Sequence, residues 1–352
     1  MDTSLAVRAE TLARVEAPDP LAAMLAGQLS EHTRRAYRHD LGHLLAFLQQ
    51  GPALDWGGLG AEAKHILIEQ TIGHPESLHR LLAVTRAELI AFRTHLKEQG
   101  LAILAVNRRL AGVGSLLREL QLQGYRPDNP ALRLRSLRTN RDHSPTIGLS
   151  AEQAKALLSA PTGDDLPAVR DRALLALLLR NGLRAAEATG LRVCDLGEDQ
   201  GFRVATIRGK GGKLRQAKLA GATWQSVKTW CDGAARWARG PEASVFVPLR
   251  KTGQRTAMKW QVVERPLTTR SLTRIVQERA GQSLPAEVAA GVRPHALRHA
   301  FATMALEAGA SLRRTQYALG HSDPRTTERY DRARENLADN AADYVARALG
   351  EV

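Results

Sequence analysis

Residues 293–301 read RPHALRHAF, which brings two arginines and two histidines together just where an apolar segment begins. Proline suits the first turn of a helix, so Pro294 predicts that a helix starts here. Residues three and four apart lie on one face of a helix, and His295, Arg298 and His299 therefore share a face. The apolar pattern that follows predicts that His299 packs in the core behind the other two.

A metal site is the first alternative for this stretch. His-x-x-x-His without a Glu between the histidines, and without a nearby Cys or carboxylate ligand, fits a zinc site poorly. We therefore expect no metal and no other cofactor.

The length of the chain, its longest apolar runs and its cysteine count limit the classes of protein to which it can belong. With 352 residues it is long enough for two domains. No run approaches the roughly 18–20 apolar residues of a membrane span, and no export signal opens the chain. Two cysteines, Cys194 and Cys231, make no disulfide framework. These features predict a cytoplasmic protein with no membrane partner.

The charge points to a polyanion. Lys and Arg number 50 against 36 Asp and Glu, a formal net charge of +14. Nucleic acid is the usual partner of such a protein, because guanidinium groups match phosphate oxygens and a positive field speeds encounter. A genome that favours Arg over Lys is the alternative, but it does not explain the net excess.

The N-terminal part of the chain predicts an all-helical domain over residues 21–138, preceded by a flexible arm, 1–20. Apolar residues at helical spacing predict helices over about 30–48, 84–96 and 106–124, with a loosely patterned segment over 51–82. Residues 126–141 carry five arginines and two prolines. They predict an extended basic connector that either follows a phosphate backbone or is a solvated hinge, with the linker itself at 139–148.

The second domain is expected over 149–352 and is mainly α with a small β-sheet or hairpin, an α+β fold. Ser150 and Gln153 match a capping box that opens a helix, and 171–179 reads as a buried helix. Alternation over 202–207 and 213–219 predicts a β-hairpin with Lys210 at its turn. A short strand is predicted at 244–249, and the remainder as helical.

Three further residues could carry chemistry. Arg184 follows a glycine break where a helix begins, and helix starts favour anions. Lys210 lies in a Gly-Lys-Gly-Gly turn, where its ammonium could approach a ligand and donate a proton. Tyr330 has a phenol of ordinary pKa near 10, so it needs positive charge or a proton acceptor to attack anything. Taken singly, each is better explained as a surface or packing residue.

Taken in order, these residues resemble the catalytic set of the tyrosine recombinase, or phage integrase, family of site-specific DNA recombinases. The matching stretches are GLRAAEATGL, RGKGGKLR, PHALRHAFAT and LGHSDPRTTERY, which carry Arg184, Lys210, His295, Arg298, His321 and Tyr330. Two N-terminal stretches, HTRRAYRHDLGHLLAFL and NRRLAGVGSLLRELQLQGYRPDNPALRLR, look like the family's core-binding domain.

The resemblance implies that Tyr330 attacks a scissile phosphodiester, giving a 3′-phosphotyrosyl intermediate and a free 5′-hydroxyl, with neither ATP nor a metal. Arg184 and Arg298 would donate to the non-bridging oxygens and His321 would help to hold the phosphate. Lys210 would protonate the leaving 5′-oxygen, and His295 would assist proton removal from Tyr330. We expect Glu187 to orient an arginine or a helix.

The resemblance also implies partners. These are double-stranded DNA recombination sites, a homotetramer on DNA, and accessory DNA-bending proteins. Apolar residues at a spacing of four over 336–349 predict a C-terminal interaction helix that docks on an adjacent protomer, or on its own domain. Segments 51–82 and 250–266 look like insertions that contact DNA or a neighbouring subunit, or are tolerated loops.

Two other functions fit part of the pattern. A type IB topoisomerase shares the attack by tyrosine but relaxes DNA without joining new partners. A non-catalytic DNA-binding regulator could use SLRRTQYALGHSDPRTTERY as a helix-turn-helix, although it would not need the six residues. Integration, excision and resolution of a DNA element remain open as tasks.

Overall fold

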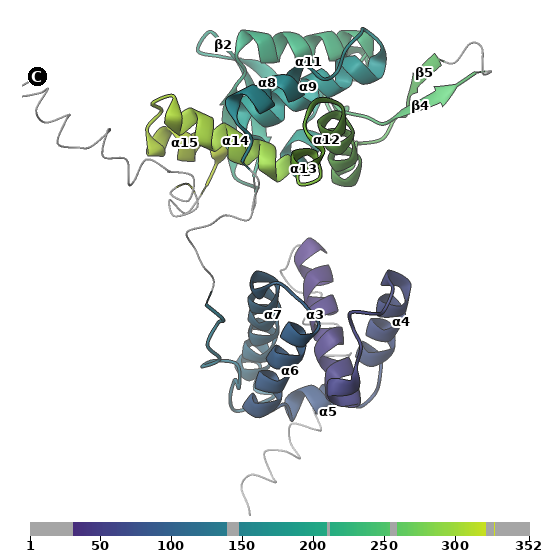
Figure 1. Cartoon of the computed structure of the whole chain (residues 1–352), viewed down its shortest axis with the longest axis vertical. Coiled ribbons are helices and arrows are strands. Elements are labelled where there is room, and N and C mark those ends of the chain that lie inside the picture. Colours follow the sequence, from purple (N-terminus) through teal and green to yellow (C-terminus); the bar gives the residue numbers. More distant parts are fainter. Residues whose placement is uncertain (1–30, 139–147, 210–211, 254–258, 322–326, 328–352) are drawn as a thin grey trace, which may run out of the picture. The chain divides into compact units, whose positions relative to one another are not determined.

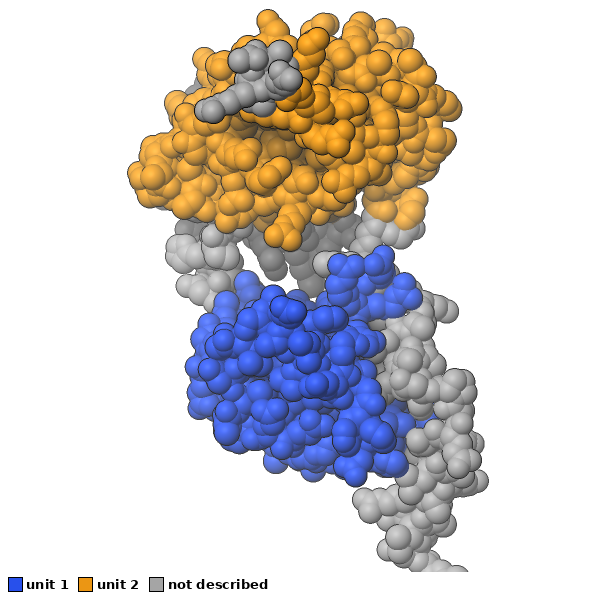
Figure 2. Space-filling view, turned by 90° about the vertical axis from the view of Figure 1, so that its right-hand side faces the viewer, with its two compact units in different colours: residues 1–141 blue, residues 142–352 orange. Residues whose placement is uncertain are grey.

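The computed structural model describes residues 31–138, 148–209, 212–253, 259–321 and 327. The chain divides into two compact units, residues 1–141 and 142–352 (Figures 1 and 2). The predicted arm at 1–20, nearly all of the linker at 139–148, Lys210, Tyr330 and the helix at 336–349 lie outside the described residues. None of the described helices combines the length and apolarity that a membrane span requires.

The described part of the N-terminal unit is helical, as predicted. Its elements are α3 (Glu31–Gln50), η2 (Gly51–Ala53), α4 (Ala61–Ile72), α5 (Ser77–Leu82), α6 (Arg86–Glu98) and α7 (Ile103–Leu122). Thr85 and Glu88 form a capping box that starts α6. The predicted apolar face of α7 is buried in the core of this unit.

The loosely patterned segment 51–82 contains two α-helices, α4 and α5, after the short helix η2. Helix α4 packs along α3, and Gly42 allows the close approach, since a Cβ there would lie 2.8 Å from Cγ1 of Ile68. The α4 sequence places few apolar residues on one face, so its helical spacing is weak. Much of the predicted insertion is therefore folded into the core of the unit.

The prediction of an extended basic connector holds only in part for residues 126–138. They form no helix or strand, and Arg133, Arg135 and Arg138 are exposed, but the segment is held on the N-terminal helices. Arg126 is 8% exposed and donates to the carbonyl oxygens of Leu81 and Val84, each at 3.2 Å. Asn107 exchanges two hydrogen bonds with the backbone of Leu137, at 2.9 and 2.8 Å. Arg126 thus satisfies backbone carbonyls of this unit, and Asn107 satisfies the backbone of Leu137, neither of which composition alone indicated.

The second unit is built around a buried helix, α9 (Leu166–Asn181), against which α8 (Ala151–Ser159), α11 (Gly221–Gly233) and α14 (Pro294–Glu307) pack. Its other helices are α10 (Ala185–Thr189), α12 (Thr269–Ser283), α13 (Ala286–Ala289), α15 (Leu312–Leu319), η3 (Val193–Asp195) and η5 (Trp237–Arg239). The Ser150–Gln153 capping box is confirmed. Helix α9 starts earlier than predicted, because Asp165 caps it by accepting from the Ala168 N–H.

The predicted hairpin is confirmed and belongs to a three-stranded antiparallel sheet in the order β1-β2-β3. The strands are β1 (Leu196–Asp199), β2 (Phe202–Arg208) and β3 (Leu214–Lys218). Pairing runs from Val204↔Lys218 to Arg208↔Leu214. The segment between β2 and β3, whose sequence includes Lys210, therefore connects two well-paired strands.

The strand predicted at 244–249 was wrong, and so was the helical expectation for the residues directly after it, up to Val262; the helical expectation holds for the described residues from Thr269 to Leu319. Val245, Phe246 and Val247 are buried in the core without forming a strand. The strand is β4 (Leu249–Thr252), which pairs antiparallel with β5 (Lys259–Val262) as a separate two-stranded ribbon (Figure 1). The apolar run indicated burial, not strand pairing.

Candidate active site

The loop between α9 and α10 places Arg184. Helix α9 ends at Gly182, which has φ +61°, and a Cβ there would lie 2.5 Å from Cδ1 of Phe301 on α14. Glycine is needed both for the left-handed conformation and for this contact. Leu183 is then buried, and Arg184 becomes the N-cap residue of α10. The glycine predicted to break the helix thus ends α9 and lets this end of α9 pack closely against α14.

Helix α14 supplies Arg298. Pro294 occupies its first turn, as predicted. The Arg298 side chain is 2% exposed and donates from Nη1 to the carbonyl oxygen of Gly182 at 2.7 Å and from Nη2 to that of Leu319 at 2.6 Å. A guanidinium with five fixed donors can bridge two such carbonyls. Arg298 therefore ties together the end of α9, helix α14 and the end of α15.

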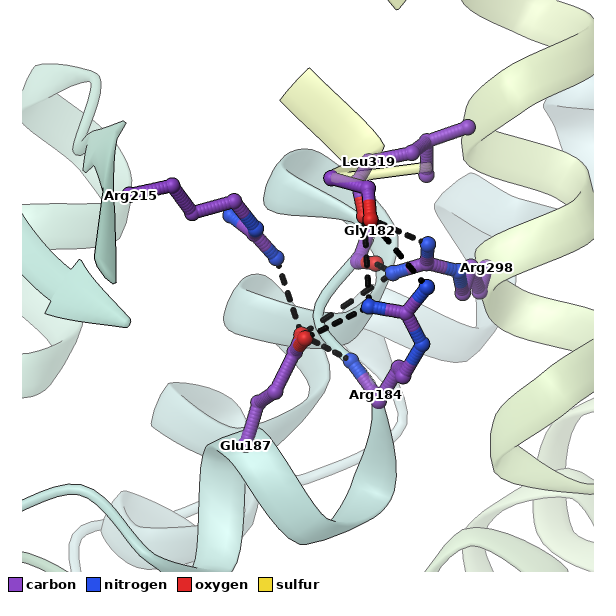
Figure 3. A network of polar contacts seen from close by, with 7 residues as sticks. Gly182, Arg184, Glu187, Arg215, Arg298 and Leu319 are labelled. Atoms are coloured by element: carbon purple, nitrogen blue, oxygen red, sulfur yellow. Dashed lines mark hydrogen bonds and ion pairs between the residues drawn. The ribbon is translucent and has the colours of Figure 1, made fainter. Parts of the chain in front are cut away.

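A buried carboxylate organises the arginines (Figure 3). Glu187, with a side chain 4% exposed, accepts from the backbone N–H of Arg184 at 2.8 Å and from its Nη1 at 2.7 Å. It also accepts from Nη2 of Arg215 at 2.8 Å and lies 3.9 Å from Nη1 of Arg298. Burial opposes ionisation, but the backbone bond from Arg184 and the charge of Arg215 together hold the pKa of Glu187 below its ordinary value.

His321 follows directly on Gly320, the residue that ends α15 with φ +64°. Its Nδ1 lies 2.8 Å from the hydroxyl of Thr327. Burial, followed by the positive charges of Arg298, Arg184 and Arg215, lowers the pKa of His321 to about 4. The imidazole is therefore neutral at pH 7.

His295 lies one turn before Arg298 on α14 and is exposed. Partial desolvation of its ring, followed by the charges of Arg298 and Arg184, lowers its pKa. A neutral imidazole can accept a proton. His299 is 3% exposed, with Nδ1 at 3.4 Å from the hydroxyl of Thr303, which agrees with the predicted packing position.

The structure thus brings together four of the six candidate residues: Arg184, His295, Arg298 and His321. Lys210 and Tyr330 belong to the residues whose placement is not described. Among the described residues, no group of three or more His, Cys, Asp or Glu side chains could hold a metal ion. The assembled groups are guanidiniums and neutral imidazoles, a set suited to binding an anion and moving a proton.

Comparison with known proteins identifies the family. A sequence model described as the phage integrase family matches residues 148–336. A tyrosine recombinase XerC of Xylella fastidiosa (strain M23) is 32% identical over 302 residues, which cover 86% of each chain. The chain belongs to the phage integrase family. It is a tyrosine recombinase, an enzyme class that cleaves and rejoins DNA.

Further relatives of this recombinase cover nearly its whole length. A tyrosine recombinase of Synechococcus elongatus is 30% identical over 357 aligned positions, 98% of each chain. The structure of XerH site-specific recombinase bound to a palindromic difH substrate matches with a TM-score of 0.57 at 16% identity, over 92% of this chain and 97% of that one. The structure of a lambda integrase dimer bound to a core site matches with a TM-score of 0.56 at 14% identity, over 94% of this chain and 98% of that one. The mainly α fold with a small sheet is thus that of the family.

Sequence reasoning missed one side chain of the recombinase's arginine cluster. Arg215 on β3 contacts Glu187, although it lies 28 residues away along the chain. Strand alternation places Arg215 opposite Ile207, a buried position, and this was the available signal. The orienting role expected of Glu187 agrees with its bonds to Arg184.

Proposed function

We propose that this tyrosine recombinase cuts and rejoins DNA at specific sites with Tyr330 as the nucleophile, through a 3′-phosphotyrosyl intermediate. The observation that supports this most strongly is the placement of Arg184 and Arg298. Both guanidiniums are fixed around the Leu319 carbonyl, beside His321. Two forked cations held at one point suit the non-bridging oxygens of a phosphodiester.

The chemistry follows from where charge develops. As the tyrosyl oxygen bonds to phosphorus, the pentacoordinate phosphorane gains negative charge on its non-bridging oxygens. Donors from Arg184 and Arg298, already ordered by protein contacts, stabilise that charge without reorganising. Loss of one such donor should cost on the order of 3 kcal/mol in the transition state.

Proton transfers complete the cycle. His295, whose lowered pKa favours the neutral imidazole, takes or relays the phenol proton of Tyr330, and His321 helps to hold the phosphate. Lys210 protonates the 5′-oxygen as the P–O bond breaks. A 5′-hydroxyl from another strand then attacks the phosphotyrosine and releases the tyrosine. The linkage conserves the bond energy, so the proposed cycle uses no ATP, metal or other cofactor.

We propose further that the substrate is a double-stranded recombination site, bound by an N-terminal core-binding domain over 21–138 and a catalytic domain over 149–352. The net charge of +14 supports a partner of high negative charge. The proposed assembly is a homotetramer on DNA linked through the helix at 336–349, with accessory DNA-bending proteins as further partners. The cytoplasm is the proposed compartment.

The test uses nicked suicide substrates taken from the genomic flanks of the gene, in which the cut fragment diffuses away. Wild-type protein should form a covalent adduct that resists denaturation. The Tyr330→Phe variant should bind the same DNA and form none. An adduct at wild-type yield with the Phe variant would contradict the assignment of the nucleophile.

A relaxation assay separates the recombinase from a type IB topoisomerase. On a supercoiled plasmid that lacks any specific site, we expect little relaxation. Efficient turnover there would favour the topoisomerase instead. DNA binding without any adduct from wild type would favour the non-catalytic regulator.

A further inference from the structure

Arg215 connects the sheet to the arginine cluster. It is the second residue of β3 and pairs with Ile207, which is 0% exposed. Side chains of directly opposed residues share a face of the sheet, so this face meets the core and α10. The Arg215 side chain is 15% exposed and ends at Glu187 (Figure 3).

The charges around Glu187 explain why a third arginine matters. Glu187 is within bonding or ion-pair distance of Arg184, Arg215 and Arg298. Three guanidiniums and one carboxylate leave a net charge of +2; without Arg215 the same cluster would carry +1. A buried carboxylate attracts its partners strongly because little water screens it. A phosphate would then compete with Glu187 for the donors of Arg184.

The path of the Arg215 side chain is also constrained. A Cβ on Gly320 would lie 2.5 Å from Nε and 2.7 Å from Cδ of Arg215. The arginine stem therefore runs against the main chain between Leu319, which accepts from Arg298, and His321. Gly320 leaves the space that this arrangement needs.

Stability alone does not account for the arrangement. Among the described residues, the buried Nη1 of Arg215 has no hydrogen-bond partner. A buried donor without a partner is costly, and an apolar side chain would avoid that cost. An apolar residue could not supply the positive charge of Arg215, so this charge is the reason to expect an arginine at this position.

We propose that Arg215 is a positioning residue that offsets the negative charge of Glu187. The positive charges and the donors of Arg184 and Arg298 then remain available to the scissile phosphate. This inference rests on the proposed function, since it needs a phosphate in the site. Arg215 acts through Glu187 and does not itself touch the substrate.

The first test compares two substrates in single-turnover cleavage. One has the natural scissile phosphodiester, and the other has a methylphosphonate there, whose methyl group removes one negative charge from the reacting centre. Arg215→Met should cleave the phosphodiester roughly 10- to 100-fold more slowly than wild type, within the range of couplings between contacting charged groups. The variant should lose less cleavage rate on the methylphosphonate, so the ratio of the methylphosphonate rate to the phosphodiester rate should be higher than in wild type. Because both rates come from one preparation, the ratio does not depend on the folded fraction.

Two control variants show how the rate ratio responds when a proposed phosphate donor is lost and when an unrelated arginine is lost. Arg184→Ala, which removes a proposed phosphate donor, should raise the ratio in the same direction. Arg203→Ala removes an arginine from the same sheet that pairs with Glu198 instead, and it should leave the ratio at the wild-type value. An unchanged ratio in Arg215→Met would overturn the inference. If wild type formed no adduct with the natural substrate, the proposed function itself would fail.

A second variant tests the route through Glu187. Glutamine has the shape of glutamate without its charge and can still accept bonds from Arg184. Adding Glu187→Gln to Arg215→Met should therefore recover at least part of the lost phosphodiester cleavage. A double variant no faster than the single one would contradict action through the carboxylate.

Discussion

Nη2 of Arg298 lies 2.6 Å from the carbonyl oxygen of Leu319, 21 residues further along the chain. This bond fixes the end of α15, and the chain continues from there into Gly320 and His321. The same guanidinium holds Gly182 at the end of α9. One buried cation thus sets the relative positions of the segments that carry Arg184 and His321.

Arg298→Lys tests this bridge. An ammonium is a compact point charge and cannot reproduce the fixed fork that reaches both carbonyls. We expect single-turnover cleavage to fall about 10²- to 10³-fold, as for loss of one preorganised donor, and thermal stability to fall as well. Arg313→Lys, at an exposed position on α15, is the matched control and should change neither. Cleavage by Arg298→Lys at the wild-type rate would contradict the role assigned to the bridge.

Gly182→Ala tests the contact between α9 and α14. Gly182 and Gly201 both have positive φ, +61° and +75°, so alanine is strained at either position. A Cβ on Gly182 would have two close neighbours, Phe301 and Leu319, whereas nothing lies within 4 Å of a Cβ on Gly201. We expect Gly182→Ala to lower the free energy of unfolding by about 1–3 kcal/mol more than Gly201→Ala, the usual cost of overpacking. Denaturant unfolding of the two variants measures the difference, and equal losses would rule out a packing role for the glycine.

Acid should destabilise the N-terminal unit through His43. This side chain is fully buried, stacks on Trp56 with ring centroids 3.7 Å apart, and contacts Arg109. Burial, followed by the charges of Arg109, His95, His39 and Lys64, lowers its pKa to about 2. Between pH 6.5 and about 2, His43 is protonated in the unfolded chain but not in the folded chain. The free energy of unfolding therefore falls as the pH falls through this window.

For His43 alone, lowering the pH from 7 to 5 should cost up to about 2 kcal/mol. His43→Phe keeps a ring against Trp56 but cannot titrate, so its loss over the same step should be smaller. Hydrogen exchange of α3 and α6 at the two pH values, corrected for the intrinsic rate, gives the comparison. Equal losses in wild type and variant would show that another group carries the acid sensitivity.

The sequence predicted those features that depend on local pattern. The face of α7, the capping box at Ser150, the first turn of α14 and the β2–β3 hairpin all follow from spacing within one element, and each is present. The proximity of Arg184, Arg298 and His321 was expected only from the resemblance to a family. No local pattern contains it.

The features that were missed depend on tertiary contacts. Arg126 looks like a solvated linker residue until the carbonyls of Leu81 and Val84 are seen to accept its bonds. Arg215 reads as one more exposed charge on a basic hairpin, yet its partner Glu187 is on another element. In both cases an arginine satisfies groups far away in the sequence. Strand alternation indicates that Arg215 shares a face with buried Ile207, but residue type and spacing do not reveal the partner of either arginine.

The central claim is that Tyr330 carries the DNA through a 3′-phosphate. The most direct measurement is mass spectrometry of the adduct trapped on a suicide substrate, after digestion of both protein and DNA. The expected result is a single modified peptide with the nucleotide on Tyr330, together with a free 5′-hydroxyl on the released strand. A modified residue other than Tyr330, or a linkage through a 5′-phosphate, would contradict the account.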